Sequence, residues 1–186
     1  LWVHSNQLLL GYYKRPELNA VIFDKDGFFD TGDIMVLTAN GDLMFAGRSK
    51  ETIALAGGEN IEPVPIEDKL LASEFIDQVM VVGDDRKTLG AIIVPNFEKV
   101  RNHAGIKGIP ESQWNENAQV REIFKNEISQ RISAKTGFKS FELIPKNIFY
   151  LVPRQFEIGQ ELTRTYKLRR TVIKDMYQNE IDSMYG

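Results

Sequence analysis

Three short polar segments of the 186-residue chain carry side chains that could take part in chemistry. The first is DTGD, in which Asp33 follows a glycine. A carboxylate has two acceptor oxygens, so Asp33 could bind both hydroxyls of a vicinal diol such as a ribose. Arg48, at the end of the next β-pattern, could reach the same ligand. The alternative is a polar turn beside a solvated strand end, and one short motif does not decide between the two.

The second segment runs from Gly47 to Asn60 and has the sequence GRSKETIALAGGEN. It places Arg48 and Lys50 where a β-pattern ends, before a short apolar run. The run is followed by four residues suited to an exposed loop, namely Gly57, Gly58, Glu59 and Asn60. Glycines allow a backbone to approach a ligand closely. The same residues would also suit a hairpin and a turn, which need charge outside and glycine at the bend.

The third segment is ELTRTYKLRR, from Glu161 to Arg170. Lys167 lies where a loop gives way to a helical pattern. Its ammonium group, on a long flexible stem, could approach and leave a developing phosphate charge. A solvated basic face is the alternative. Because electrostatic catalysis by one lysine needs a dry, closed site, this small region would require a partner domain.

Composition excludes several other kinds of site. The formal net charge of −3 gives no chain-wide attraction to phosphate polymers, so no nucleic-acid partner is expected. The absence of cysteine excludes a disulfide framework, a thiolate metal site and a cysteine nucleophile, and it fits a reducing cytosol. His4 and His103 have no second ligand at metal-binding spacing, so we expect no metal site. No apolar run approaches the roughly 20 residues that cross a bilayer.

The elements that would position these residues differ along the chain. Residues 1–46 are rich in aromatics and turns, and the segments 34–39 and 42–46 flank Asn40 and Gly41. That pair predicts a β-hairpin with a two-residue loop and positive φ at both loop residues. Residues 1–46 would bury too little apolar surface for a stable domain, so we expect them to be the end of a larger one.

From about Glu51 onward the pattern is α/β. The expected elements are a short helix in 62–73, strands at 78–82 and 89–94, a helix at 117–135, a strand at 147–152 and a terminal helix from Leu168. The two neighbouring strands are joined by a polar turn. Residues 103–116 are turn-rich, and no element is predicted there.

The order of four motifs, GYYKRPE, GFFDTGD, GRSKETIALAGGENIEPVPIED and LTRTYKLRR, resembles the adenylate-forming acyl-CoA synthetases. The GGEN variant resembles their long-chain fatty acid branch, and the resemblance covers essentially the whole chain. It implies that residues 1–48 end a large N-terminal adenylation domain and that residues 49–50 are a hinge. Residues 51–186 would be a mobile C-terminal α/β domain, with a short mixed sheet flanked by helices.

The same resemblance implies a role for each candidate residue. Asp33 would bind the ribose hydroxyls of ATP or of the acyl-adenylate, with Arg48 assisting from the same side. Lys50 would be the hinge about which the small domain turns. Lys167 would contact the reacting carboxylate and the α-phosphate. The loop of Gly57, Gly58, Glu59 and Asn60 would line the pantetheine tunnel for coenzyme A.

The implied activity is that of an acid-thiol ligase. ATP with Mg²⁺ would activate a fatty acid to an acyl-adenylate, and coenzyme A would then accept the acyl group, with pyrophosphate and AMP released. No tightly bound cofactor is expected. The partner would be the chain's own N-terminal domain, and the location would be cytoplasmic, with attachment to the inner face of a membrane left open. The phosphate loop, the adenine-contacting motif and the acyl tunnel of the family are absent, so the chain alone is expected to be inactive.

Some residues depart from the pattern of this family. Arg164 stands where a proline is common, and Tyr166 where many members have glycine. Ala54 and Leu55 occupy positions that are often basic or polar. Two alternatives therefore remain beside the fatty acid ligase. One is an isolated, non-catalytic α/β binding or interaction module, and the other is an adenylating ligase for an aryl, bile or amino acid.

Overall fold

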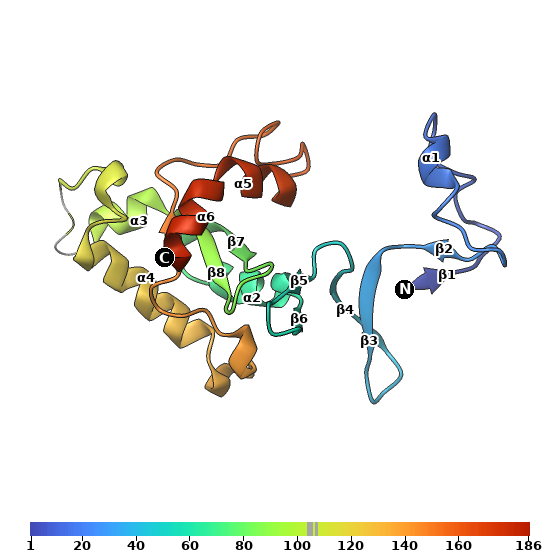
Figure 1. Ribbon diagram of the computed structural model, residues 1–186, viewed down its shortest axis with the longest axis horizontal. Coiled ribbons are helices and arrows are strands. Elements are labelled where there is room, and N and C mark those ends of the chain that lie inside the picture. The colour runs from blue at the N-terminus through green and yellow to red at the C-terminus, as the bar shows by residue number, and fades with distance from the viewer. Residues whose placement is uncertain (104–105, 107) are drawn as a thin grey trace. The chain divides into compact units, whose positions relative to one another are not determined.

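The computed structural model describes residues 1–103, 106 and 108–186 (Figure 1). The chain divides into two compact units, Leu1–Thr52 and Ile53–Gly186. Lys50 lies in a turn close to the boundary between the units. Its role as a hinge, and the domain limits at 48 and 51, stay predictions.

The first unit contains two short antiparallel pairs of strands. Strand β1 pairs with β2, and β3 pairs with β4 in the predicted hairpin. The elements of this unit are β1 (Trp2–Val3), α1 (Pro16–Asn19), β2 (Phe29–Asp30), β3 (Asp33–Leu37) and β4 (Leu43–Arg48). Within residues 1–52, all of which are described, no apolar side chain larger than alanine is buried. This unit therefore has no hydrophobic core of its own.

The hairpin is confirmed, but the prediction of its two-residue loop is wrong. The backbone N–H of Thr38 donates to the carbonyl of Asp42 over 2.8 Å, and that of Gly41 donates to the carbonyl of Thr38 over 3.0 Å. The loop thus has three residues, and only Gly41 has a positive φ, of +86°. The Thr38 hydroxyl also accepts from the Asp42 N–H, at 3.0 Å, and this bond favours the longer loop.

The second unit is built on the predicted mixed sheet. Strands β7 (Ile76–Val82) and β8 (Gly90–Pro95) are antiparallel, and β9 (Phe149–Leu151) runs parallel to β8 on its other side. Every residue of β8 is buried, as expected for a central strand that is covered on both faces. The side chain of Asn115 lies at the edge of β9, where it donates to the carbonyl and accepts from the N–H of Leu151, both over 2.7 Å.

Alternate residues of the sheet enter two hydrophobic clusters, one on each face. Val79, Val81 and Ile93 pack with α2 (Pro63–Leu71) and α4 (Ala118–Arg131). Met80, Val82, Ile92 and Val94 instead pack with α5 (Arg170–Met176) and α6 (Gln178–Tyr185). The second unit is therefore a three-layer α/β domain (Figure 1).

The remaining elements of this unit are short. They are β5 (Ile53–Ala54), β6 (Asn60–Ile61), α3 (Phe97–Asn102) and the 3₁₀ helices η1 (Glu111–Gln113), η2 (Ala134–Thr136) and η3 (Ser140–Glu142). In the turn-rich segment 103–116, residues 104, 105 and 107 lie outside the described residues. Among the described residues, no helix has the length and hydropathy that a membrane crossing requires.

Two helix boundaries differ from the predictions. The helix predicted for 117–135 begins after Asn117, whose side chain accepts from the N–H groups of Gln119 and Val120 at 3.0 Å, but it ends at Arg131. The predicted single terminal helix is two helices, α5 and α6, because Tyr177 leaves the helical conformation with φ −111° and ψ 23°. The Tyr177 side chain is buried at this break.

Candidate functional site

Two of the candidate segments contain a loop of the same backbone design as the turn of the β3–β4 hairpin. Two backbone hydrogen bonds close each of three hairpin loops. The N–H of the first residue donates to the carbonyl of the fifth, and the N–H of the fourth residue donates to the carbonyl of the first. These closing pairs are Thr38 and Asp42, Leu55 and Glu59, and Thr163 and Lys167. A three-residue loop of this kind needs a left-handed residue in its fourth position. That position holds Gly41, Gly58 and Tyr166, with φ of +86°, +91° and +60°.

Lys167 closes the third of these loops. Its backbone N–H donates to the hydroxyl of Thr163 over 3.0 Å, and its carbonyl accepts from the Thr163 N–H over 2.9 Å. The backbone of Lys167 is thus fixed twice, while its side chain is exposed. Lys167 therefore has a fixed backbone position and an exposed side chain that carries the ammonium group.

Tyr166 is strained at the tip of the same loop. For an L-residue the left-handed conformation costs roughly 1–2 kcal/mol, because the β-carbon approaches the next carbonyl. Tyr166 is 72% exposed, so burial of its ring does little to offset that cost. Strain of this kind persists where the surrounding structure enforces it, often beside a functional residue. The neighbour of Tyr166 in the chain is Lys167.

The first end of the Lys167 loop is anchored by Glu161, whose side chain is fully buried. One Glu161 carboxylate oxygen pairs with Arg154 and lies 3.4 Å from the Tyr177 hydroxyl, and the other accepts from the Glu157 N–H at 3.1 Å. Burial opposes ionisation of Glu161 most strongly, but Arg154 and the backbone donors outweigh it and hold its pKa below the usual value. Burial also raises the pKa of Tyr177 to about 12, so its hydroxyl remains a donor.

The second end of the loop is anchored by Arg170. Its guanidinium forms an ion pair with Glu67 of α2, and both side chains are largely buried. The other oxygen of Glu67 accepts the Val81 N–H of β7 over 2.7 Å. Because removal of one partner would strand a buried charge, such a pair resists separation. The Lys167 loop is therefore tied at both ends to the sheet and the helices, while its tip remains exposed.

Neither anchoring carboxylate is predicted from the sequence. Glu161 appears there only as the first residue of a basic segment, and the position of Glu67 in its helix indicates an interaction with the helix dipole rather than a buried ion pair. The one available signal was the position of Glu67 next to Ile66 in an apolar helix, where a carboxylate that faces the core needs a partner. The partner residue, Arg170, is too distant in sequence for such a signal to identify.

Gly57, Gly58 and Glu59 lie in the turn that connects β5 to β6, and Asn60 is the first residue of β6. Gly58 needs glycine because of its φ of +91°, whereas a β-carbon on Gly57 would only meet the flexible Glu59 carboxylate. The neighbouring Ala56 N–H donates to the Arg86 carbonyl over 2.8 Å, which holds the loop against the turn after β7. Both glycines are exposed, so the loop presents bare backbone to solvent.

Asp33 and Arg48 form the first residue pair of the β3–β4 hairpin. The Oδ1 atom of Asp33 lies 2.9 Å from Nε of Arg48, in an ion pair that leaves Arg48 about half exposed. The Asp33 N–H donates to the Thr31 hydroxyl over 3.1 Å. The DTGD turn therefore fixes the backbone of Asp33, and the ion pair with Arg48 directs its carboxylate.

Arg48 and Lys50 also line a pocket of about 380 Å³ within the first unit. Its other walls include Tyr12, Ile22 and Gly32. Asp33 is not among the lining residues, although it is paired with Arg48. The structure thus brings Asp33, Arg48 and Lys50 together in residues 1–52, and it places Lys167 and the Gly57–Asn60 loop in residues 53–186. No group of three or more His, Cys, Asp or Glu side chains among the described residues is arranged to hold a metal.

Comparison with known proteins adds a family and several relatives. A family model described as the AMP-binding enzyme C-terminal domain matches residues 50–186. The probable acyl-activating enzyme 16, chloroplastic, of Arabidopsis thaliana is 34% identical over 98% of this chain and 26% of its own length. Long-chain-fatty-acid–CoA ligase 5 of Rattus norvegicus is 35% identical over 98% of this chain and 27% of its own length.

A third relative is the chloroplastic long-chain-fatty-acid–acyl-carrier-protein ligase AEE15 of Arabidopsis thaliana, 33% identical over 99% of this chain and 25% of its own length. Among solved structures, the A domain of carboxylic acid reductase from Segniliparus rugosus, in complex with AMP and a co-purified carboxylic acid, is similar. It has a TM-score of 0.82 and 26% identity, and the match covers 99% of this chain and 27% of that one. The chain thus spans about a quarter of the length of the curated relatives it matches.

Proposed function

Because this chain belongs to the family of AMP-binding enzyme C-terminal domains, we propose that it is the carboxy-terminal part of a long-chain fatty acid–CoA ligase. Such an enzyme is an acid-thiol ligase that uses ATP to make an acyl-adenylate and then transfers the acyl group to coenzyme A. The observation that carries the proposal is Lys167, an exposed lysine on a loop that ion pairs with buried carboxylates fix at both ends. The relatives named as long-chain-fatty-acid–CoA ligases support the choice of substrate class.

In the proposed adenylation step, a fatty carboxylate attacks the α-phosphate of ATP and pyrophosphate leaves. Negative charge gathers between the two reacting groups, and the Lys167 ammonium would be held against it. A charge that is already in place stabilises the transition state without a cost of reorganisation at the moment of reaction. The fixed backbone of the loop supplies this placement, and the long side chain supplies the reach. Mg²⁺ would accompany the ATP phosphates as a co-substrate ion and help to neutralise their charge.

Asp33 and Arg48 would hold the nucleotide in both steps. The ion pair with Arg48 fixes the buried Oδ1 of the Asp33 carboxylate, and the second oxygen, Oδ2, retains acceptor capacity for a ribose hydroxyl. The guanidinium of Arg48 is half exposed and has donors that remain available to a phosphate. These roles need residues of a large N-terminal adenylation domain, which we propose as the partner of this chain.

In the proposed thioesterification step, rotation about Lys50 would withdraw Lys167 and bring the Gly57–Asn60 loop to the site. The exposed backbone of Gly57 and Gly58 would then line the path of the pantetheine arm of coenzyme A. The coenzyme A sulfur attacks the acyl carbonyl, and AMP leaves. A swing of this kind lets one active site serve two reactions and keeps water out of each.

A carrier protein is the second candidate for the thiol acceptor. The relative named as a long-chain-fatty-acid–acyl-carrier-protein ligase is about as similar to this chain as the CoA ligases are. Parallel assays of the intact enzyme with coenzyme A and with an acyl carrier protein distinguish the two acceptors. Thioester formation on the carrier protein alone would replace the first candidate with the second.

The decisive experiment is Lys167→Ala in the full-length ligase. We expect fatty-acid-dependent pyrophosphate release to fall by about 10²–10³-fold, the loss typical for one electrostatic catalytic group. Thioester formation from a preformed acyl-adenylate should be spared. The matched control is Lys146→Ala, which removes another exposed lysine of the same unit. Equal losses in both steps would contradict the assignment of Lys167 to adenylation.

A second measurement uses the 186-residue chain by itself. We expect no pyrophosphate release from ATP and fatty acid, because the chain would lack the surfaces that enclose the substrates. Fatty-acid-dependent release by the pure chain would overturn the proposal that a larger N-terminal domain is needed.

A further inference from the structure

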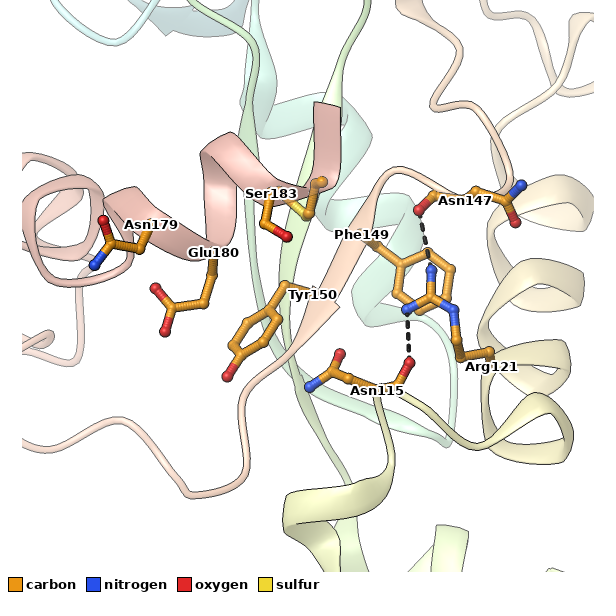
Figure 2. Close-up of a pocket in the computed structure, with 9 residues that line it drawn as sticks. Asn115, Arg121, Asn147, Phe149, Tyr150, Asn179, Glu180 and Ser183 are labelled. Atoms are coloured by element: carbon orange, nitrogen blue, oxygen red, sulfur yellow. Dashed lines mark hydrogen bonds between the residues drawn. The ribbon is translucent and has the colours of Figure 1, made fainter. Parts of the chain in front are cut away.

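A second pocket lies within residues 53–186, and none of its lining residues belongs to the segment from Glu161 to Arg170 (Figure 2). It has a volume of about 390 Å³, within the range of small-molecule sites. The lining comes from three places: Asn115 before α4 and Arg121 within it, Asn147 and Tyr150 around β9, and several residues of α6. No role proposed above involves this pocket.

Arg121 supplies a fixed positive charge at one side of the pocket. Its guanidinium donates to the Asn147 carbonyl over 3.0 Å and to the Asn115 carbonyl over 3.4 Å, and it lies 4.2 Å from the centre of the Phe149 ring. Burial lowers the pKa of Arg121 from its usual value, but a guanidinium stays protonated. Among the described residues Arg121 has carbonyl and ring partners but no carboxylate. Its charge is therefore held in place without being neutralised.

Glu180 supplies a negative charge from α6 on the opposite side. In Figure 2 the ring of Tyr150 lies between the Glu180 carboxylate and the Arg121 guanidinium. Within the part of the chain that the structure describes, Glu180 forms no ion pair. Burial, and then the Glu180 charge, raise the pKa of Tyr150, so its hydroxyl is neutral and can both donate and accept. The pocket thus offers a cation, a hydroxyl and a carboxylate in series.

We propose that this pocket binds a small zwitterion of the amino-acid class, with its carboxylate on Arg121 and its ammonium on Glu180. Each charge of such a ligand would meet an unneutralised partner, and the desolvation of one group would be compensated by the other. A polyanion such as a nucleotide is a poorer fit, because Glu180 would repel its additional charges. A simple carboxylate would leave Glu180 unsatisfied.

The test is a titration of the isotopically labelled chain, followed by amide chemical shifts. The probes are 4-aminobutyrate and 6-aminohexanoate as zwitterions of two lengths, with butyrate and butylammonium as single-charge analogues. We expect saturable shifts in β9 and α6, with one zwitterion bound about tenfold more tightly than either analogue, since one added charge contact is worth about that much. If neither zwitterion binds, or if neither exceeds butyrate, the proposal is wrong.

Glu180→Gln is the principal variant, because Glu180 is a helix-surface residue whose neutralisation should leave the fold intact. In the Glu180→Gln variant, the affinity for the zwitterion should fall to the affinity for butyrate. Arg121→Gln should weaken the binding of both the zwitterion and butyrate, because each binds through a carboxylate. If Arg121→Gln fails to fold, Arg121→Lys keeps the positive charge and should weaken the binding of the same two ligands. The matched control is Asp175→Asn, an exposed carboxylate of α5 outside the pocket, which should change nothing. An unchanged affinity in Glu180→Gln would overturn the proposal.

Discussion

The two units hold their candidate residues by different means. In residues 53–186, the Lys167 loop is tied through Glu161 and Arg170 to a domain with hydrophobic clusters on both faces of its sheet. In residues 1–52, Asp33 and Arg48 are held by the backbone of one hairpin and by a partly exposed ion pair. The difference indicates that the second unit is structurally self-sufficient, whereas the first needs other protein surface to become rigid.

The exposed apolar side chains support the same conclusion. Large apolar residues of the first unit that are at least partly open to solvent include Leu10, Tyr13, Leu37, Leu43 and Phe45. Apolar surface that is concentrated in this way usually marks an interface. We therefore expect the first unit to pack against the N-terminal domain that the proposed function requires.

The largest expected difference concerns packing. Phe124→Ala removes a side chain with 0% exposure from the core of the second unit, and it should lower the free energy of unfolding by about 3–5 kcal/mol. Phe45→Ala, at a side chain that is 49% exposed in the first unit, should cost less than about 1 kcal/mol. Urea unfolding followed by fluorescence measures both values, with Trp114 as the probe of the second unit and Trp2 as the probe of the first. A similar loss in the two variants would show that the first unit has a core after all.

The next difference concerns ion pairs. Glu67→Gln leaves Arg170 without its carboxylate in a largely buried site, so we expect a loss of about 3 kcal/mol in the free energy of unfolding. Arg48→Gln breaks a pair that is about half exposed, and solvent screening should limit its effect to about 0–1 kcal/mol. The same urea experiment measures both. If Arg48→Gln were the more damaging variant, the ion pair of the first unit would be the better protected one.

Acid should weaken the second unit through Glu161. Its pKa is lower in the folded chain than its ordinary value of 4.5, so the unfolded chain binds a proton first. Glu161 stabilises the fold fully at pH values above about 4.5, the pKa of the unfolded chain. This stabilisation is lost progressively as the pH falls from there through the lower pKa of the folded chain. Glu161→Gln should therefore remove part of the decrease in unfolding free energy between neutral pH and acid. A variant with the same pH dependence as the wild type would show that Glu161 does not contribute.

The smallest expected effects concern the left-handed loop positions. Gly41→Ala in the first unit and Gly58→Ala in the second should each cost about 1 kcal/mol, because both glycines have positive φ. Tyr166→Gly should instead stabilise the chain by less than about 1 kcal/mol. The substitution relieves the strain of the left-handed conformation, but glycine also gives the unfolded chain more conformational freedom, which offsets part of the gain. Thermal melting resolves these shifts. A clear destabilisation by Tyr166→Gly would show that the tyrosine ring makes a useful contact.

The sequence predicts the local elements well and the distant contacts poorly. Apolar periodicity located the strands around Val79 and Ile92 and the helix around Ile66, because burial on a regular element leaves a repeating pattern. The break at Tyr177 could not be predicted, since neither proline nor glycine marks it. What accompanies the break is a tertiary contact, because the buried Tyr177 hydroxyl lies 3.4 Å from the Glu161 carboxylate.

The candidate site follows the same rule. The motifs located Lys167 and Asp33, but nothing local indicated that Glu67 would reach Arg170, 103 positions away in the chain. The Lys167→Ala variant tests the role of Lys167, and the roles of Asp33, Arg48 and Lys50 remain proposals. The left-handed conformation of Tyr166 could be suspected only from its position where glycine is common in similar sequences.

Two of the side chains described above also decide how the sheet meets other chains. Asn115 binds both backbone groups of Leu151 at the outer edge of β9, and Glu67 takes the Val81 N–H at the outer edge of β7. An open strand edge is a template on which another chain can add a strand, and this is a common start of aggregation. Each edge of this three-stranded sheet is already occupied by a side chain of its own molecule. A strand from another chain could add at Val81 or at Leu151 only by displacing the side chain that already binds there.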